Sequence, residues 1–141
     1  NPEVCQNDGV KMVQSVEELY ANSDFVSVHI PATPETKKSL NYDLLSKMPK
    51  GAALINTARK EVVDEEGLEK VLAERADFKY ASDVAPENLA QLMEKYPAQV
   101  FATAKKMGAE TAEANMNAGL AAARQIVDFL VNGNRRFQVN K

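Results

Sequence analysis

The sequence predicts an α/β fold in which a parallel sheet is flanked by helices and a long helix follows toward the C-terminal end. Two observations carry this prediction. Short apolar runs suited to buried strands alternate with longer segments that have the spacing of helices. The short runs are apolar on both faces, as is typical of parallel sheets covered by helices. The chain has 141 residues, 45% of them hydrophobic, which is the length and composition of one folded domain.

The first half of the chain is expected to hold three strands with short helices between them. Ser15 caps a helix, and Glu18 can reach back to complete a capping box. The next strand ends at Pro31, which lacks the N–H that a central strand needs. Thr33, with the proline and glutamate after it, predicts a helix cap and first turn. The expected elements are a strand at 10–13, a helix at 15–22, a strand at 25–30, a helix from 34, a helix at 41–48 and a strand at 52–56.

The second half continues the same alternation. Asp64 caps a helix with one apolar face and with acidic residues in its first turn, where the helix dipole favours them. A long helix closes the pattern, and Gly133 just past its end suits a C-cap. The expected elements are this helix from 65, a strand at 78–82, a weakly patterned helix at 89–95, a strand at 100–103 and the long helix at about 110–131.

Residues that follow the strands are the first candidates for a binding site. Right-handed crossovers place the carboxyl ends of all strands at one edge, where ligands of open α/β sheets bind. Arg59 offers a charged planar fork that can hold a carboxylate, and the small Thr57 and Ala58 let a ligand approach the backbone. Asp83 ends another strand and could accept hydrogen bonds from an amide or a sugar hydroxyl. A surface ion pair for Arg59, and a helix cap or turn for Asp83, are the structural alternatives.

Three further groups near this edge are candidates for proton transfer. Lys105 follows the last core strand beside Lys106, and neighbouring ammonium groups favour each other's neutral form, which an acid–base lysine needs. His29 is the only histidine, although its apolar neighbours equally fit a packed, hydrogen-bonded ring. Glu87 lies in the loop after Asp83, where most glutamates are simply solvated. Paired lysines are also common on solvated surfaces.

Composition and charge exclude several classes of protein. The 17 basic and 20 acidic residues leave no basic stripe for nucleic-acid phosphates, so no nucleic-acid partner is expected. No apolar run approaches the roughly 20 residues of a membrane span. The single cysteine, Cys5, excludes an internal disulfide and, with no apolar leader, indicates a cytoplasmic protein. The six glycines are dispersed, so no glycine-rich pyrophosphate turn is present, and no metal site is expected.

Five segments in this order resemble one known family: 28–36, 53–59, 62–65, 82–84 and 103–108. The series is similar to the D-isomer-specific 2-hydroxyacid dehydrogenases, and within them to the branch that oxidises 3-phosphoglycerate. The resemblance covers nearly the whole chain. It implies a partial Rossmann-like sheet, with residues 1–141 forming the C-terminal portion of the NAD-binding domain, without its glycine-rich turn and without the N-terminal substrate domain.

The resemblance also implies roles for individual residues. Arg59 is similar to the arginine that holds the substrate carboxylate and polarises the reacting oxygen, and Asp83 to the acceptor for the nicotinamide carboxamide. The family pairs a glutamate with an acid–base histidine; here Glu87 lies one position early, and Lys105 stands at the histidine position with Lys106 as an apparent insertion. The expected catalytic residues are Arg59, Lys105 and Glu87, and the expected NAD-binding residues are Thr57, Ala58, Arg59, Asp83, His29 and Pro31.

The implied activity is the NAD-dependent oxidation of a D-2-hydroxy acid, with 3-phosphoglycerate converted to 3-phosphohydroxypyruvate in serine biosynthesis as the specific expectation. The implied partners are this small molecule and, in a full-length protein, a second copy in a homodimer. The 141-residue chain alone is expected to be inactive. The alternatives are a non-catalytic dinucleotide-sensing or scaffolding module, and a generic α/β domain with chance motifs.

Overall fold

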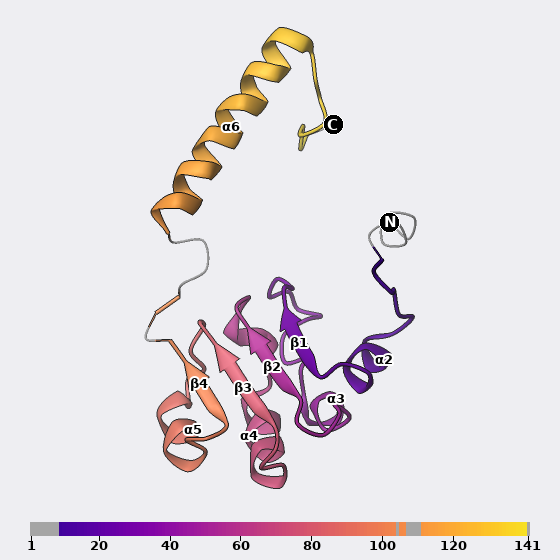
Figure 1. Ribbon diagram of the computed structural model, residues 1–141, viewed down its shortest axis with the longest axis vertical. Coiled ribbons are helices and arrows are strands. Elements are labelled where there is room, and N and C mark those ends of the chain that lie inside the picture. Colours follow the sequence, from indigo (N-terminus) through magenta and orange to yellow (C-terminus); the bar gives the residue numbers. More distant parts are fainter. Residues whose placement is uncertain (1–8, 104, 107–110, 141) are drawn as a thin grey trace. The chain divides into compact units, whose positions relative to one another are not determined.

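Four short parallel strands form one sheet (Figure 1). The computed structural model describes residues 9–103, 105–106 and 111–140, and the chain divides into two units, 1–106 and 107–141. The strands lie in the first unit in the order β1-β2-β3-β4, and every neighbouring pair is parallel. Their bounds are Phe25–Val28 for β1, Ala53–Asn56 for β2, Lys79–Ser82 for β3 and Val100–Ala102 for β4. The predicted α/β fold with a parallel sheet is therefore confirmed.

The helices begin where polar side chains can satisfy their free N–H groups. Ser15 accepts a hydrogen bond from Glu18 N, Asn41 from Leu44 N, and Asp64 from Gly67 N. The helices of the first unit are α2 (Val16–Ala21), α3 (Tyr42–Leu45), the short 3-10 helix η1 (Lys60–Val62), α4 (Glu65–Glu74) and α5 (Leu89–Lys95). The caps predicted at Ser15 and Asp64 are confirmed, and Asn41 caps the start of the helix predicted at 41–48.

One face of the sheet carries the core. Exposure alternates along the strands, so that Leu54 and Tyr80 are buried together with Leu45, Leu68 and Leu72 from α3 and α4. The opposite face differs, because Phe25 is 74% exposed and Phe101 is 65% exposed. The side chains of Phe25 and Phe101 on this face are therefore left uncovered by the described residues of the first unit.

Two predicted elements are wrong. Residues 10–13 form no strand, because no strand among the described residues pairs with them and Val10 and Met12 are exposed. The helix expected from 34 is a turn: the Thr36 hydroxyl donates to Pro31 O and accepts from Thr33 N, which closes the backbone locally. Lys38 then takes a left-handed φ of 53°, which a continuing helix excludes.

The second unit consists of one helix and the segment after it. Helix α6 (Ala112–Asn132) is capped by Thr111 and ends at Gly133, whose φ of 67° is the left-handed conformation that glycine adopts without strain. Asp128 accepts hydrogen bonds from Asn132 and Asn134, which lower the pKa of its carboxyl and hold the segment after the helix. The long C-terminal helix is confirmed. Among the described residues, no helix combines the length and the apolar character that crossing a membrane requires.

An arginine network ties together the turns at the amino ends of β2 and β3. The Arg75 guanidinium donates to Met48 O, Pro49 O and Asp77 Oδ2, each at 2.7 Å. Asp77 Oδ2 also accepts from Gly51 N at 2.6 Å. The hydrogen bond from Arg75, followed by that from Gly51, lowers the pKa of Asp77 to about 2 from its ordinary value of 3.8.

We expect Asp77→Asn to lower the melting temperature at neutral pH. Because the folded state depresses the pKa of this carboxyl, its stabilising effect is complete above pH 3.8 and is lost as the pH falls toward 2. The difference in melting temperature between the wild-type and variant chains should therefore shrink over this range in calorimetric scans. A difference that stays constant down to pH 2 would contradict this account.

Candidate site at the carboxyl edge of the sheet

The loops that follow β2, β3 and β4 start side by side at one edge of the sheet (Figure 1). The backbone pairing continues just beyond the strands, because Asp83 N donates to Asn56 O and Thr103 N donates to Ser82 O. The residues that follow Asn56, Ser82 and Thr103 are therefore neighbours. This is the edge at which the sequence places the candidate site.

Asn56, the last residue of β2, fixes the loop that carries Arg59. Its side chain is fully buried. Asn56 Oδ1 accepts from Ala58 N at 3.0 Å, and Asn56 Nδ2 donates to Arg59 O at 2.9 Å. These two bonds form a turn that holds residues 57–59 against the end of the strand.

Two cations meet on this loop. Arg59 Nη1 donates to Ala58 O at 2.8 Å, while Lys106 Nζ lies 3.2 Å from Thr57 O and 3.4 Å from the same Ala58 O. Among the described residues, neither cation forms an ion pair with a carboxylate. The surface ion pair considered for Arg59 is thus not formed there. An anion at this point would meet two positive charges and the forked donor of an arginine.

Lys105 and Lys106 differ in their surroundings. Lys105 is exposed, and its carbonyl accepts from the Thr103 hydroxyl at 2.7 Å. Lys106 is half-buried, with its ammonium group on the loop of Arg59. The catalytic role predicted for Lys105 stays a prediction, and the geometry brings Lys106 to Arg59.

Asp83 lies at the end of β3 and is only 7% exposed. It does not cap a helix, because α5 begins at Leu89 with Asn88 at its cap position. The neighbouring Ser82 hydroxyl donates to Asn56 O at 2.8 Å and accepts from Val84 N, which connects the ends of β2 and β3. A carboxylate held this deeply at the strand end is suited to accept hydrogen bonds from a bound ligand.

Glu87 is directed toward a different lysine from those expected. Its carboxylate lies 3.1 Å from Lys60 Nζ, and this hydrogen bond raises the pKa of Lys60. The two carboxylate oxygens of Glu65 accept from the N–H groups of Glu87 and Asn88. These residues border a cleft of about 500 Å³. Asn88, one position further on, has a buried amide oxygen with no hydrogen-bond partner among the described residues.

His29 is exposed, and it forms a hydrogen bond of 2.8 Å with the Ser27 hydroxyl. The packed ring considered for it is therefore not observed, although the hydrogen bond is. The reason is that His29 continues the alternation of β1 on the side of Phe25 and Ser27, which are also exposed. With Ile30 it lines a groove of about 750 Å³ beside β1, and Pro31 follows at the end of this strand.

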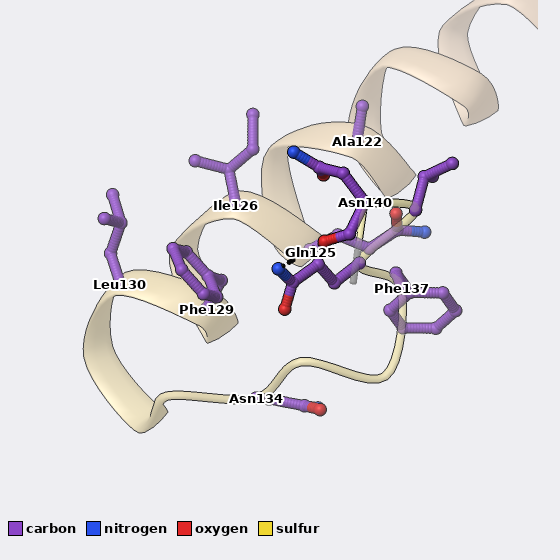
Figure 2. A pocket seen from close by; sticks show the side chains of 10 residues that line it. Ala122, Gln125, Ile126, Phe129, Leu130, Asn134, Phe137 and Asn140 are labelled. Carbon is purple, nitrogen blue, oxygen red and sulfur yellow. Dashed lines mark hydrogen bonds between the residues drawn. The ribbon is translucent and has the colours of Figure 1, made fainter.

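A groove of about 700 Å³ in the second unit is a separate feature (Figure 2). It lies between α6 and the segment after it, with Ile126, Phe129 and Phe137 among its lining residues. None of the predicted site residues lines it, and its lining contains no ionisable side chain. No group of three or more His, Cys, Asp or Glu side chains in the described part of the chain could hold a metal ion.

Sequence reasoning missed three groups that the structure brings to this edge: Asn56, Lys60 and Glu65. An asparagine that ends a buried strand and precedes small residues is a signal for a side-chain turn, and it could have identified Asn56. Nothing local could have identified Lys60 or Glu65, because their partners lie more than 20 positions away in the chain.

The edge has features that suit the nicotinamide end of a dinucleotide. The buried carboxylate of Asp83 could accept hydrogen bonds from an amide, and the half-buried Thr57 and Ala58 leave little side-chain bulk over their backbone. His29 and Pro31 lie at the end of the edge strand. The residues present therefore fit a nicotinamide cofactor.

Comparisons with known proteins agree with this interpretation. Residues 1–118 match the family model described as D-isomer specific 2-hydroxyacid dehydrogenase, NAD binding domain. The chain is 36% identical over 135 residues to D-3-phosphoglycerate dehydrogenase of Haemophilus influenzae, covering 92% of this chain and 33% of that protein. It is 37% identical over 118 residues to glyoxylate reductase of Thermofilum pendens, covering 82% of this chain and 34% of that protein.

A solved structure extends the similarity. The NAD+-bound 3-phosphoglycerate dehydrogenase of Entamoeba histolytica superimposes with a TM-score of 0.76 at 43% identity, covering 99% of this chain and 50% of that one. The chain thus spans between a third and a half of the length of these relatives. On the family match, the chain belongs to the D-isomer specific 2-hydroxyacid dehydrogenases, within their NAD-binding domain.

Proposed function

We propose that this chain is part of an NAD-dependent dehydrogenase that oxidises 3-phosphoglycerate to 3-phosphohydroxypyruvate, a reaction of serine biosynthesis. The observation that carries the proposal is the pair of cations, Arg59 and Lys106, on the carbonyl of Ala58. The names of the Haemophilus and Entamoeba relatives support the choice of substrate. In this proposal the chain supplies the C-terminal portion of the NAD-binding domain, and the complete enzyme is a homodimer.

The substrate carboxylate binds to Arg59. The Arg59 guanidinium can donate two parallel hydrogen bonds to a carboxylate. It can also divide its donors between the carboxylate and the oxygen that becomes the carbonyl oxygen. Because the oxidised product has a polarised carbonyl oxygen, a positioned cation stabilises it more than the alcohol. This difference is what makes Arg59 a catalytic group.

A lysine removes the hydroxyl proton. The sequence assigns this role to Lys105, whereas the position of Lys106 Nζ beside the loop of Arg59 favours Lys106. In its neutral form the amine accepts the proton from the hydroxyl oxygen, and the carbon atom that bears this oxygen gives up the hydride and becomes the carbonyl carbon. Glu87 has its carboxylate on Lys60, so it would act on the proton-carrying lysine only after exchanging this partner.

Bound NAD would supply the acceptor for the hydride. Asp83 would accept a hydrogen bond from its carboxamide, and Thr57, Ala58, His29 and Pro31 would contact the rest of the cofactor.

Turnover assays of the complete protein test the proposal. With NAD present, 3-phosphoglycerate should be oxidised with a higher kcat/KM than D-lactate or D-glycerate, and the reverse reaction should favour 3-phosphohydroxypyruvate over glyoxylate. A preference for glyoxylate would reassign the substrate within the family. Glyoxylate is included because one relative of this chain is named glyoxylate reductase.

A non-catalytic dinucleotide-sensing or scaffolding module is the second candidate. It is favoured by one observation, the engagement of Glu87 with Lys60. Calorimetric binding of NADH by the complete protein, with no turnover of any of these substrates, would support this candidate against the dehydrogenase.

A further inference from the structure

Asn56 is completely buried, and both polar atoms of its side-chain amide form hydrogen bonds. The residue is 0% exposed, on the core face of β2 between β1 and β3. A buried amide is costly unless its donor and acceptor are both satisfied. Asn56 satisfies them on the loop after the strand, with Ala58 N at 3.0 Å and Arg59 O at 2.9 Å.

The backbone of Asn56 is held as firmly as its side chain. Its carbonyl accepts from the Ser82 hydroxyl at 2.8 Å and from Asp83 N at 3.3 Å. Asn56 is therefore held in the sheet by its backbone, and its side-chain amide holds the loop. The side chain of Arg59 is exposed, but the backbone that carries it is fixed by these hydrogen bonds.

The chemistry of the side chain is specific to asparagine. Asparagine offers an acceptor oxygen and a donor NH2 group at the same distance from its backbone. An aspartate would place a second acceptor against Arg59 O, and a serine is too short to reach both backbone groups. An alanine would leave Ala58 N and Arg59 O without these partners.

We propose that Asn56 is a positioning residue for Arg59. By fixing Ala58 N and Arg59 O, it holds the guanidinium where the substrate carboxylate and reacting oxygen bind, and it touches neither substrate nor cofactor itself. The proposal rests on the proposed function of Arg59. Because a displacement of about 1 Å can cost about 100-fold in rate, loss of this turn should be measurable in kcat/KM.

A double-mutant cycle in the complete enzyme tests the proposal. We expect Asn56→Ala to lower kcat/KM for the hydroxy acid by roughly 10- to 100-fold. In an Arg59→Ala background the same change should have less than about a twofold effect, because Asn56 then has no guanidinium to position. High enzyme concentrations, with NADH fluorescence as the signal, keep the residual rates of these variants measurable.

Gln99→Ala is the matched control. The Gln99 amide donates to Leu72 O, Arg75 O and Phe78 O at the opposite, amino edge of the same sheet. The Gln99→Ala variant should have a lower melting temperature, as Asn56→Ala should, but its kcat/KM should stay within about twofold of the wild type. A general loss of stability would therefore be seen in both variants, and a loss of positioning only in Asn56→Ala.

The outcomes separate the two proposals. Equal losses in the wild-type and Arg59→Ala backgrounds, or no loss at all, would overturn the positioning role while leaving the dehydrogenase activity intact. A wild-type enzyme without turnover would overturn the proposed function, and the role of Asn56 with it. If Asn56→Ala does not fold, Asn56→Ser keeps one of the two hydrogen bonds and enters the same cycle.

Discussion

Arg59→Lys is expected to lower kcat/KM for the 2-hydroxy acid by about 100-fold or more, although the positive charge is kept. An ammonium group is a point charge and cannot offer the fork that binds a carboxylate through two parallel bonds. Removing one positioned donor to the transition state typically costs roughly 100- to 1000-fold. Steady-state kinetics of the complete enzyme measure the loss.

Arg75→Lys is the control for this substitution. Arg75 makes its side-chain hydrogen bonds at the opposite, amino edge of the sheet, with Met48, Pro49 and Asp77. Its replacement should lower the melting temperature and leave kcat/KM close to that of the wild type. If Arg59→Lys retained near-normal kinetics, Arg59 would not be the carboxylate-binding group.

The second large effect is expected from removing the lysine that accepts the hydroxyl proton of the substrate. Lys106→Ala is expected to remove most turnover, by about 100-fold or more, because a general base typically contributes roughly 100- to 10,000-fold. NADH affinity should fall much less than turnover, since Asp83, the proposed acceptor for the carboxamide, is kept. Lys106→His should restore part of the activity, with the pH–rate limb moved toward the ordinary pKa of imidazole, about 6.5.

Lys105→Ala is the comparison that decides between the two lysines. Lys105 is exposed, and only its backbone carbonyl has a described partner, the Thr103 hydroxyl. We expect its alanine variant to keep more activity than Lys106→Ala. The opposite ranking would make Lys105 the proton acceptor, as the sequence predicts. A dead His29→Asn variant with both lysine variants active would make His29 the proton carrier.

The sequence by itself determined the order and type of most elements. The strands at β1 to β4, the starts of α2, α3 and α4 and the end of α6 follow from local features: apolar runs, cap residues and the left-handed glycine after α6. Such features are sufficient because each depends on residues within one turn or one strand. The same reasoning failed at residues 10–13 and 34–38, where apolar or proline patterns were present without a partner strand or a continuing helix.

The sequence also placed Arg59 and Asp83 at one edge of the sheet, because both directly follow predicted strands and parallel strands end at one edge. It could not decide which lysine approaches Arg59, where Glu87 points or what holds the loop of Arg59. Lys106 lies almost 50 positions after Ala58, and Lys60 lies 27 positions before Glu87. Adjacent residues have different side-chain directions, and only the path of the backbone after β4 brings one of them back to the end of β2. Contacts between residues so far apart in the sequence depend on the pairing of β2, β3 and β4. Only the tertiary structure therefore decided which side chains lie together at this edge.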